Sequence, residues 1–265
     1  MNTKIDVIMA VNSIDNFLSE SINSILKQTY GNFMFIIVCN GEKASDVKMH
    51  IEENFNDDRI VLFCINLSGL SNALNYGICN SSSKYIARQD ADDVSHKDRL
   101  SKQIAYLESN HNIGVLGCGV QLIDGHSKPL PDKFISVNLD LSIRRLLPVI
   151  NSMCHPALIY RRQCIIEAGG YKFGGFSEDH ELYLRILRMK KWKFHNLSET
   201  LFDYRRHDGQ LTSQGSYKNF CDISSFMMGH ILLTGNLFGI LGILWVFPPV
   251  IFFKRLVRKL IRFSV

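Results

Sequence analysis

A short stretch in the first half of the chain joins a strand pattern to a cluster of acids, and it reads Tyr85-Ile86-Ala87-Arg88-Gln89-Asp90-Ala91-Asp92-Asp93. Three carboxylates in four positions repel one another, so folding them together is costly unless a cation compensates. Mg²⁺ and Mn²⁺ take oxygen ligands and keep positions open for substrate phosphates. The stretch therefore predicts a metal-diphosphate site at the end of a strand. The alternative is a solvated acidic turn that caps a helix beginning near His96.

Strand and helix patterns alternate around this stretch at the pace of βαβ units. The expected strands are 5–11, 33–39, 59–65, 84–87 and 113–118, and the expected helices are 17–28, 44–55, 69–79 and 97–110. This order predicts an α/β fold with a mostly parallel central sheet and helices on both faces. Ligands of such sheets bind at the carboxyl ends of the strands.

The composition indicates a folded protein with a neutral body. Of the 265 residues, 46% are hydrophobic and 21% are charged, which excludes disorder, collagen and coiled coil. The net charge of +5 comes from residues 226–265, which hold five basic residues and no acid, so residues 1–225 carry 25 charges of each sign. A balanced body argues against nucleic-acid binding and assigns the basic excess to whatever the C-terminal segment touches.

The cysteines and the N-terminal residues favour the cytoplasmic compartment. Seven cysteines are scattered, mostly within apolar runs, and none has a CxxC spacing, so we expect reduced core residues. The first residues pass straight into a strand pattern, without the basic and apolar segments of a secretory signal.

The C-terminal segment is first apolar and then basic. Residues 226–253 contain no Asp, Glu, Lys or Arg, and the stretch 231–253 spans 23 residues, whereas ~20 suffice to cross a bilayer. Glycines and the pair Pro248-Pro249 interrupt it, and a single crossing would put the basic residues 254–262 on the side opposite the body. We therefore expect re-entrant or interfacial insertion, with a basic tail helix on anionic headgroups. The alternative is a core helix pair or a dimer interface.

A second acidic group, Glu178-Asp179-His180-Glu181, follows glycine-rich turns and opens a predicted helix. A carboxylate at a helix N-terminus has a lowered pKa and is ionised at neutral pH, which suits a general base or an anchor for substrate hydroxyls. Helix capping alone is the alternative interpretation.

A cationic segment, Tyr204-Arg205-Arg206-His207, follows a short strand expected near residues 201–202. An arginine pair beside an imidazole is suited to bind phosphate, and a neutral His207 can ligate a metal ion. His155, before a predicted strand, is a further candidate. Ordinary packing is the alternative for both histidines.

Taken in order, several segments resemble family 2 glycosyltransferases, which have the GT-A fold. The segments are Val7-Ile8-Met9-Ala10-Val11, Ser24-Ile25-Leu26-Lys27-Gln28-Thr29-Tyr30, Gly69-Leu70-Ser71-Asn72-Ala73-Leu74-Asn75-Tyr76-Gly77, residues 85–93, Ala168-Gly169-Gly170-Tyr171, Glu178-Asp179 and residues 204–207. The resemblance implies a Rossmann-like GT-A domain whose nucleotide-sugar-binding half is residues 1–110 and whose acceptor-binding half is residues 111–225. Residues 226–265 are then a hydrophobic and basic tail of membrane-associating helices.

The resemblance also implies roles for single residues. The aspartates of the DxD segment hold Mg²⁺ or Mn²⁺ on the donor diphosphate, the ED pair supplies the base that deprotonates the acceptor, and Cys39-Asn40 contact the nucleotide base where the family usually has paired acids. The implied catalytic residue is Asp179; the donor-binding residues are Ala10, Val11, Asn12, Asn40, Asn72, Arg88 and Asp90; the acceptor-binding residues are Glu178 and His155; and the metal ligands are Asp90, Asp92 and His207.

The resulting prediction is an inverting, metal-dependent glycosyltransferase. It is expected to move a sugar from a nucleotide-diphosphate donor to a lipid-linked or polysaccharide acceptor at the cytoplasmic face of a membrane, as a peripheral or monotopic protein that binds no nucleic acid. Two alternatives stay open. One is a non-catalytic, membrane-bound homologue that binds a nucleotide sugar. The other is a haloacid-dehalogenase-type phosphohydrolase, whose DxDx[TV] pattern residues 90–94 fit, although that pattern should follow the first strand of its domain.

Overall fold

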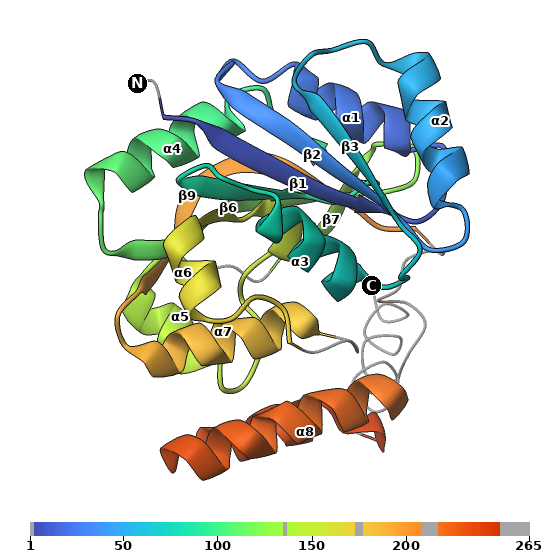
Figure 1. Ribbon diagram of the computed structural model, residues 1–265. Helices are drawn as coiled ribbons and strands as arrows, with labels where there is room; N and C mark the ends of the chain where they lie inside the picture. The colour runs from blue at the N-terminus through green and yellow to red at the C-terminus, as the bar shows by residue number, and fades with distance from the viewer. Residues whose placement is uncertain (1–2, 135–136, 173–176, 208–216, 250–265) are drawn as a thin grey trace.

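The strands form one mixed sheet. The structure, a computed structural model, describes residues 3–134, 137–172, 177–207 and 217–249. Its strands are β1 (Ile5–Val11), β2 (Phe33–Asn40), β3 (Ile60–Ile65), β4 (Tyr85–Gln89), β5 (Val94–Ser95), β6 (Ile113–Ile123), β7 (Pro129–Lys133), β8 (Ile159–Arg161) and β9 (Lys193–Arg205). Across the sheet they lie in the order β3-β2-β1-β4-β8-β6-β9-β5, with β7 paired to β6 (Figure 1).

Helices cover both faces of this sheet. They are α1 (Leu18–Leu26), α2 (Ala44–Asn54), α3 (Leu70–Cys79), α4 (Arg99–Ser109), α5 (Asp140–Leu146), α6 (Arg162–Glu167), α7 (Glu178–Met189), α8 (Tyr217–Thr234) and α9 (Phe238–Val246), with a 3-10 turn at His155–Ala157. Val7 and Met9 of β1 belong to the core formed with α1, α2 and α4, whereas Ile8 belongs to the core formed with α3 and α7. Alternation along the strand thus divides the core between the two faces.

The N-terminal half confirms the predicted βαβ pattern. Strands β3, β2, β1 and β4 are parallel neighbours. The observed bounds of these strands and of α1–α4 differ from the predicted ones by two residues at most. Because the four strands run in the same direction, the segments that follow β1, β2 and β4 meet at one edge of the sheet.

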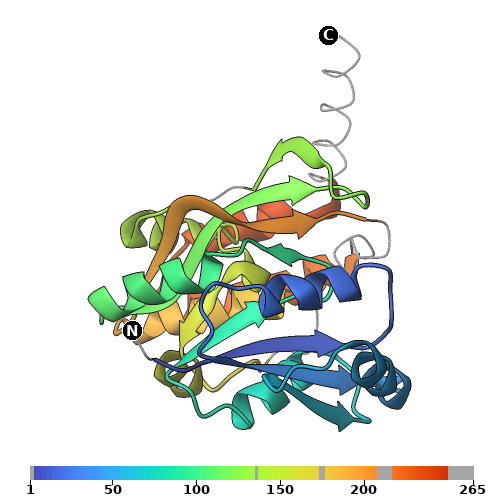
Figure 2. The ribbon, with the colours of Figure 1, turned by 90° about the horizontal axis from the view of Figure 1, so that it is seen from above.

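The second half corrects the prediction of a mostly parallel sheet. Strand β8 is antiparallel to both β4 and β6, β7 to β6, and β5 to β9, while β6 and β9 are parallel. A parallel pair needs a long crossover, whereas β6 and β7 are joined by a short turn in which the Asp124 N–H donates to the Lys128 carbonyl at 2.9 Å. Figure 2 shows the blue N-terminal strands and the green and orange C-terminal strands as the two sides of the sheet.

The cysteines match the prediction in part. All seven are free; Cys39, Cys118, Cys154 and Cys164 are buried, and Cys64, Cys79 and Cys221 are exposed. The exposed thiols lie on an edge strand, at a helix end and on a surface helix, so an apolar run in the sequence did not guarantee burial.

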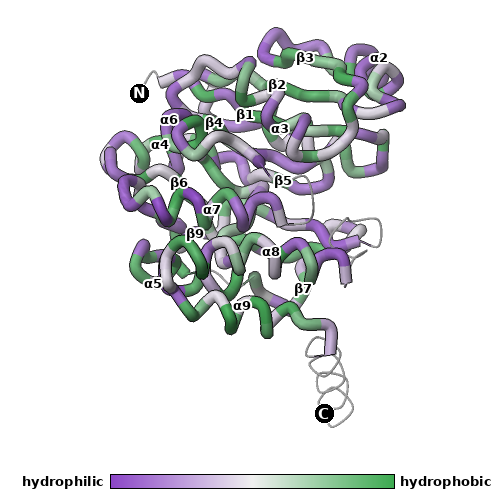
Figure 3. The backbone as a smooth tube through the Cα atoms, turned by 60° about the horizontal axis from the view of Figure 1, so that its bottom comes forward, coloured by the Kyte–Doolittle hydropathy of each residue, from purple (hydrophilic) through white to green (hydrophobic). Residues whose placement is uncertain are grey.

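Helices α8 and α9 lie toward the end of the molecule away from β3 and α2 (Figures 1 and 3). Helix α8 packs against α7, and Gly235, with a φ of 68°, turns the chain between α8 and α9. Among the described helices we find none with the length and apolar character needed to span a membrane. The predicted basic helix at residues 254–262 lies outside the described residues. Membrane association of the tail stays a prediction.

Candidate active site

The acidic stretch leaves β4 at the edge where the parallel strands end. Ligand atoms of Asp90, Asp92 and Asp93 all lie within 4.8 Å of one another. Asp93 is fully buried, and its Oδ2 has no hydrogen-bond partner among the described residues. Burial raises the pKa of Asp93 well above its ordinary value, and the charges of Asp92 and Asp90 raise it further. The cluster thus concentrates negative charge, and oxygen donors in this arrangement fit a divalent cation.

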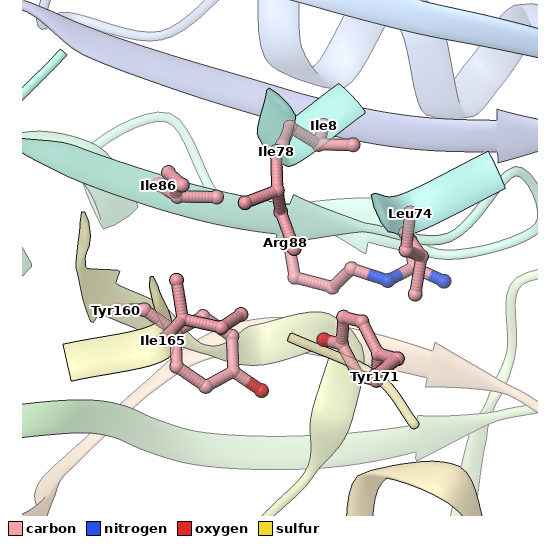
Figure 4. Close-up of a pocket in the computed structure, with 8 residues that line it drawn as sticks. All are labelled: Ile8, Leu74, Ile78, Ile86, Arg88, Tyr160, Ile165 and Tyr171. Carbon is pink, nitrogen blue, oxygen red and sulfur yellow. The ribbon is translucent and has the colours of Figure 1, made fainter. Parts of the chain in front are cut away.

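Arg88 forms an ion pair with this cluster. Its guanidinium donates hydrogen bonds to the Asp90 carboxylate and to the Gln89 carbonyl. The side chain is 2% exposed, and its Nε has no hydrogen-bond partner among the described residues. Figure 4 shows Arg88 in a small cavity that Tyr171 also lines. Arg88 therefore combines a bond to the acidic cluster with an unused donor.

Arg205 holds the acidic loop in place through hydrogen bonds. Its backbone N–H donates to Asp93 Oδ1 at 2.8 Å, and its Nε donates to the Asp92 carbonyl at 2.7 Å. Its terminal nitrogens donate to Glu20 at 2.6 Å and to Ser127 Oγ at 2.9 Å. Arg205 is fully buried and engaged within the protein, so the prediction that it grips phosphate is wrong; it positions the acidic loop.

His207 lies beside the same cluster. Its Nε2 is 3.0 Å from Asp92 Oδ2, and its ring packs on Phe17 with the centroids 4.9 Å apart. This position next to an acidic ligand is compatible with metal binding, which stays a prediction. Arg206, in contrast, is exposed and pairs with Asp132 at 3.3 Å.

Glu178 and Asp179 open helix α7, as the sequence predicts. The Asp179 carboxylate accepts a hydrogen bond from Asn151 Nδ2 on Oδ2 at 2.7 Å and another from the His180 N–H on Oδ1 at 2.8 Å. Asn151 Oδ1 in turn accepts a hydrogen bond from the Met153 N–H at 3.0 Å. This chain of bonds fixes the orientation of the carboxylate.

Burial, more than the helix terminus, controls the pKa of both carboxyls. Burial raises the pKa of Asp179 to about 6, although the hydrogen bonds from His180 and Asn151 lower it. Burial, followed by the charge of Asp179, raises the pKa of Glu178 to about 8. The predicted lowering of these pKa values is therefore wrong, because desolvation of the charged form outweighs the helix dipole.

The acidic groups at residues 90–93 and 178–179 influence each other electrostatically. The charge of Asp90 raises the pKa of both Glu178 and Asp179, and the charge of Arg88 lowers that of Glu178. Contacts show the same proximity, because Arg88 lines one cavity with Tyr171, and Tyr171 contacts His155, whose Nδ1 is 3.7 Å from Glu178. The end of β4 and the start of α7, which are far apart in the chain, therefore lie close together.

His155 lies behind Glu178. Its Nε2 is 2.6 Å from the Tyr171 hydroxyl, and its Nδ1 is 3.7 Å from the Glu178 carboxylate. Burial, with a smaller effect of Arg88, lowers the pKa of His155 well below its usual value, so the ring is neutral at neutral pH. The neutral ring lies near Glu178 without a hydrogen bond to it, and its predicted contact with an acceptor stays a prediction.

The predicted donor-binding residues follow the same edge of the sheet. Ala10 and Val11 end β1, Asn12 follows, Asn40 ends β2, and Asn72 lies in the first turn of α3. Asn40 is buried; its Nδ2 donates to the Val11 carbonyl at 3.0 Å and its Oδ1 accepts from the Gly69 N–H at 3.3 Å. It ties both strand ends to the start of α3, while Asn12 and Asn72 are exposed there.

Sequence reasoning missed one residue of this site and the role of another. Asn151 lies in an irregular segment after α5, where neither a motif nor a periodic pattern marks it. Arg205 was singled out, but its partners come from α1, the acidic loop and the β6–β7 turn, which only the fold brings together. The acidic loop follows the fourth strand, which does not favour the haloacid-dehalogenase interpretation.

Known proteins resemble this chain in sequence and in fold. The profile of Glycosyl transferase family 2 matches residues 7–169. The O-antigen biosynthesis glycosyltransferase WbnJ of Escherichia coli is 33% identical over 246 residues, which cover 92% of this chain and 94% of that protein.

Two solved structures share the fold at low identity. S. aureus TarS 1-349 in complex with UDP-GlcNAc aligns with a TM-score of 0.68 and 16% identity, over 86% of this chain and 66% of that chain. Mannosyltransferase PcManGT from Pyrobaculum calidifontis, in complex with GDP-Man and Mn²⁺, aligns with a TM-score of 0.66 and 13% identity, over 94% of this chain and 73% of that chain. The fold is GT-A-like. The matched profile covers more than half of the chain, so this protein belongs to glycosyltransferase family 2 and is a glycosyltransferase.

Proposed function

We propose that this glycosyltransferase moves a sugar from a nucleotide-diphosphate donor to an acceptor hydroxyl, with Asp179 as the general base. The observation that carries the proposal is a chain of contacts that joins the two acidic groups. Arg88 bonds to Asp90 and lines the same cavity as Tyr171. The Tyr171 hydroxyl is 2.6 Å from His155 Nε2, and His155 Nδ1 is 3.7 Å from the Glu178 carboxylate. Such a transfer needs a cation site at the leaving diphosphate and a proton acceptor at the incoming hydroxyl. Residues 90–93 supply the cation site, and residues 178–179 supply the proton acceptor.

The proposed donor site is the edge formed by β1, β2 and β4. Nucleotide ligands of α/β sheets bind at such edges, and the buried guanidinium of Arg88 has an Nε donor that no described residue uses. The neighbours TarS and PcManGT were solved with UDP-GlcNAc and GDP-Man. These observations support a nucleotide-diphosphate sugar bound by Ala10, Val11, Asn12, Asn40, Asn72, Arg88 and Asp90.

The acidic cluster fits Mg²⁺ or Mn²⁺. The oxygens of Asp90, Asp92 and Asp93 lie close together, and Asp93 Oδ2 lacks a partner among the described residues. A bound ion stabilises the negative charge that develops on the leaving diphosphate. The protein itself holds the carboxylates in place through Arg205, and His207 beside Asp92 is a further candidate ligand.

Asp179 accepts the proton of the acceptor hydroxyl. Its pKa of about 6 leaves it ionised at neutral pH while keeping a useful affinity for a proton. Asn151 and the His180 N–H orient the carboxylate. A hydroxyl that attacks from the face opposite the diphosphate inverts the anomeric centre, so we propose an inverting reaction. Glu178 and His155 are then on the acceptor side.

The proposed acceptor is lipid-linked or a polysaccharide, and the proposed location is the cytoplasmic face of a membrane. The relative from E. coli carries O-antigen biosynthesis in its name, which supports a surface polysaccharide. The apolar and then basic sequence from residue 226 supports a membrane surface. The equal numbers of acidic and basic residues in residues 1–225 support the expectation that nucleic acid is no partner.

Release of nucleoside diphosphate tests the proposal. Purified protein with Mn²⁺ or Mg²⁺ is screened against a panel of nucleotide sugars, and Asp179→Asn is measured in parallel. We expect metal-dependent release with at least one donor and a large loss in the variant. Binding without turnover across the panel would support the non-catalytic alternative, and hydrolysis of a generic aryl phosphate would support the phosphohydrolase.

A further inference from the structure

Helix α9 packs against the protein with Gly239, Gly242, Ile243 and Val246, while its other large side chains are exposed. Its nine residues are apolar, yet the buried ones are Gly239 and Gly242. A Cβ atom on Gly239 would lie 2.6 Å from Ile231 Cγ1, and one on Gly242 would lie 2.7 Å from the Pro148 carbonyl oxygen. The close approach needs glycine, so these two positions fix which side of the helix faces inward.

The outward side of α9 and the end of α8 form what we call the exposed apolar face. It consists of Leu232, Leu233, Leu237, Phe238, Leu241 and Trp245, whose exposed fractions lie between 47% and 78%. Leu237, Leu241 and Trp245 recur at intervals of four residues, so they lie along one side of α9. Figure 3 shows α9 as a hydrophobic segment. A surface helix of a soluble protein normally has the reverse arrangement, and exposed apolar patches mark interaction sites.

The charge pattern of the chain indicates what covers this face. Residues 226–253 carry no Asp, Glu, Lys or Arg, and residues 254–265 add five basic residues and no acid. A bilayer with anionic headgroups matches both features, because acyl chains take up the apolar side chains and headgroups attract the cations. A second copy of the chain would match the apolar side chains but would leave the basic excess without a partner.

The exposed apolar face is connected to the active site through α7. The ring of His180, which follows Asp179, lies 5.5 Å from that of Phe226 on α8. Further along, Arg188 Nη1 is 3.2 Å from His230 Nδ1. The helix that begins next to the proposed base therefore packs directly on α8, which in turn packs on α9.

We propose that the exposed apolar face docks on an anionic bilayer and thereby presents the start of α7 to an acceptor carried on a membrane lipid. The docking mode is interfacial: α9 lies in the headgroup region with Leu237, Leu241 and Trp245 inserted. Support for the docking comes from the exposed apolar side chains and the charge pattern. Only the statement about the lipid-carried acceptor rests on the proposed function.

Trp245 provides the probe for this test. The chain has two tryptophans, and Trp192 is 6% exposed, so the emission that responds to lipid comes from Trp245, which is 47% exposed. With vesicles of mixed phosphatidylglycerol and phosphatidylcholine we expect a blue shift, co-flotation of the full chain, and weaker binding at high salt. Vesicles of phosphatidylcholine alone should bind less, and Trp245→Phe should abolish the shift.

Matched leucine variants show which surface binds. The double variant Leu237→Asn and Leu241→Asn should lower the vesicle partition coefficient at least about tenfold. The control is Leu67→Asn, because Leu67 is 62% exposed against 66% for Leu237 but follows β3 at the other end of the molecule. Equal binding of all three proteins, or no flotation of the wild type, would overturn the proposal.

Two further readouts separate the possible failures. A dimer in light scattering, with Trp245 emission already blue-shifted without vesicles, would assign the face to a second copy and would also overturn the proposal. Release of nucleoside diphosphate with a water-soluble acceptor should be equal in wild type and in the leucine double variant. Vesicle binding without release of nucleoside diphosphate would contradict the proposed reaction but not the proposed docking.

Discussion

The two acidic groups of the active site differ in the hydrogen bonds and neighbouring charges that surround their carboxylates. The group at residues 90–93 gathers three carboxylates, one of which is fully buried with an oxygen that lacks a partner among the described residues. At residues 178–179, by contrast, Asp179 is held by hydrogen bonds from Asn151 and the His180 N–H. The first arrangement suits a cation, and the second suits a proton that is taken up and released near neutral pH. Variants of each group should therefore fail in different ways.

The largest effect is expected from Asp92→Ala. Loss of the central carboxylate should remove metal-stimulated turnover and lower kcat by about 10⁴-fold, since a bound ion supplies several kcal/mol of charge stabilisation. Nucleoside diphosphate release over a range of Mn²⁺ concentrations measures this. Asp132→Ala is the control, because Asp132 is exposed and pairs with Arg206. An Asp92→Ala enzyme that still responds to Mn²⁺ like the wild type would contradict a cation site at residues 90–93.

A smaller loss is expected from Asp179→Asn. This change keeps the shape of the side chain and removes the proton acceptor, so kcat should fall about 10³-fold while the affinity for donor and Mn²⁺ is unchanged. Donor binding by calorimetry and turnover by diphosphate release separate the two quantities. Glu181→Gln, in the same helical turn but paired with Arg185 at 2.7 Å, should keep most of the activity. Weaker donor binding with normal kcat would assign Asp179 to the donor instead.

Metal binding should also stabilise the fold. At a concentration about 100 times its Kd, Mn²⁺ should add about 2.7 kcal/mol and raise Tm by about 5 °C or more. In Asp93→Asn the increase should be largely lost. The metal-free variant should melt at a higher temperature than the metal-free wild type, because it no longer buries a carboxyl group whose ionisation the interior disfavours. Equal Mn²⁺ shifts in both proteins would show that Asp93 has no part in the site.

The smallest effect concerns the pH profile. Because Asp179 must be ionised, kcat/KM should fall below about pH 6. The hydrogen bond from Asn151 stabilises the ionised form, so Asn151→Ala should raise this pKa and move the acidic limb upward by about one unit. Turnover near pH 8 should change little, and Asn151→Gln should partly restore the profile. A uniform loss at every pH would indicate a structural role for Asn151 instead.

Much of the N-terminal half could be predicted from the sequence. Apolar runs such as Ile5–Val11 and Phe33–Asn40 have strand character throughout their length, and the helices between them have regular apolar spacing. The long strand Lys193–Arg205 was largely missed because Asn196, Ser198 and Glu199 interrupt its pattern. Its pairing with β6 depends on irregular register near Gly117 and Gly119, which no local pattern encodes.

The candidate site was predictable where carboxylates follow a strand or open a helix. Asp90, Asp92 and Asp179 stand in such positions, so the chain itself marks them. The role of Arg205 and the bond from Asn151 depend on tertiary contacts. The pKa direction of Asp179 was mispredicted for the same reason, since local sequence indicates the helix terminus but not how much water the fold excludes.

A crystal structure of the protein with Mn²⁺ and a nucleoside diphosphate tests the convergence of the two acidic groups most directly. We predict that the ion binds the carboxylates of Asp90, Asp92 and Asp93, and that the Asp179 carboxylate faces it within about 15 Å across a single cleft with room for one sugar. An ion bound elsewhere, or an Asp179 carboxylate beyond that distance with no such gap, would contradict the mechanism.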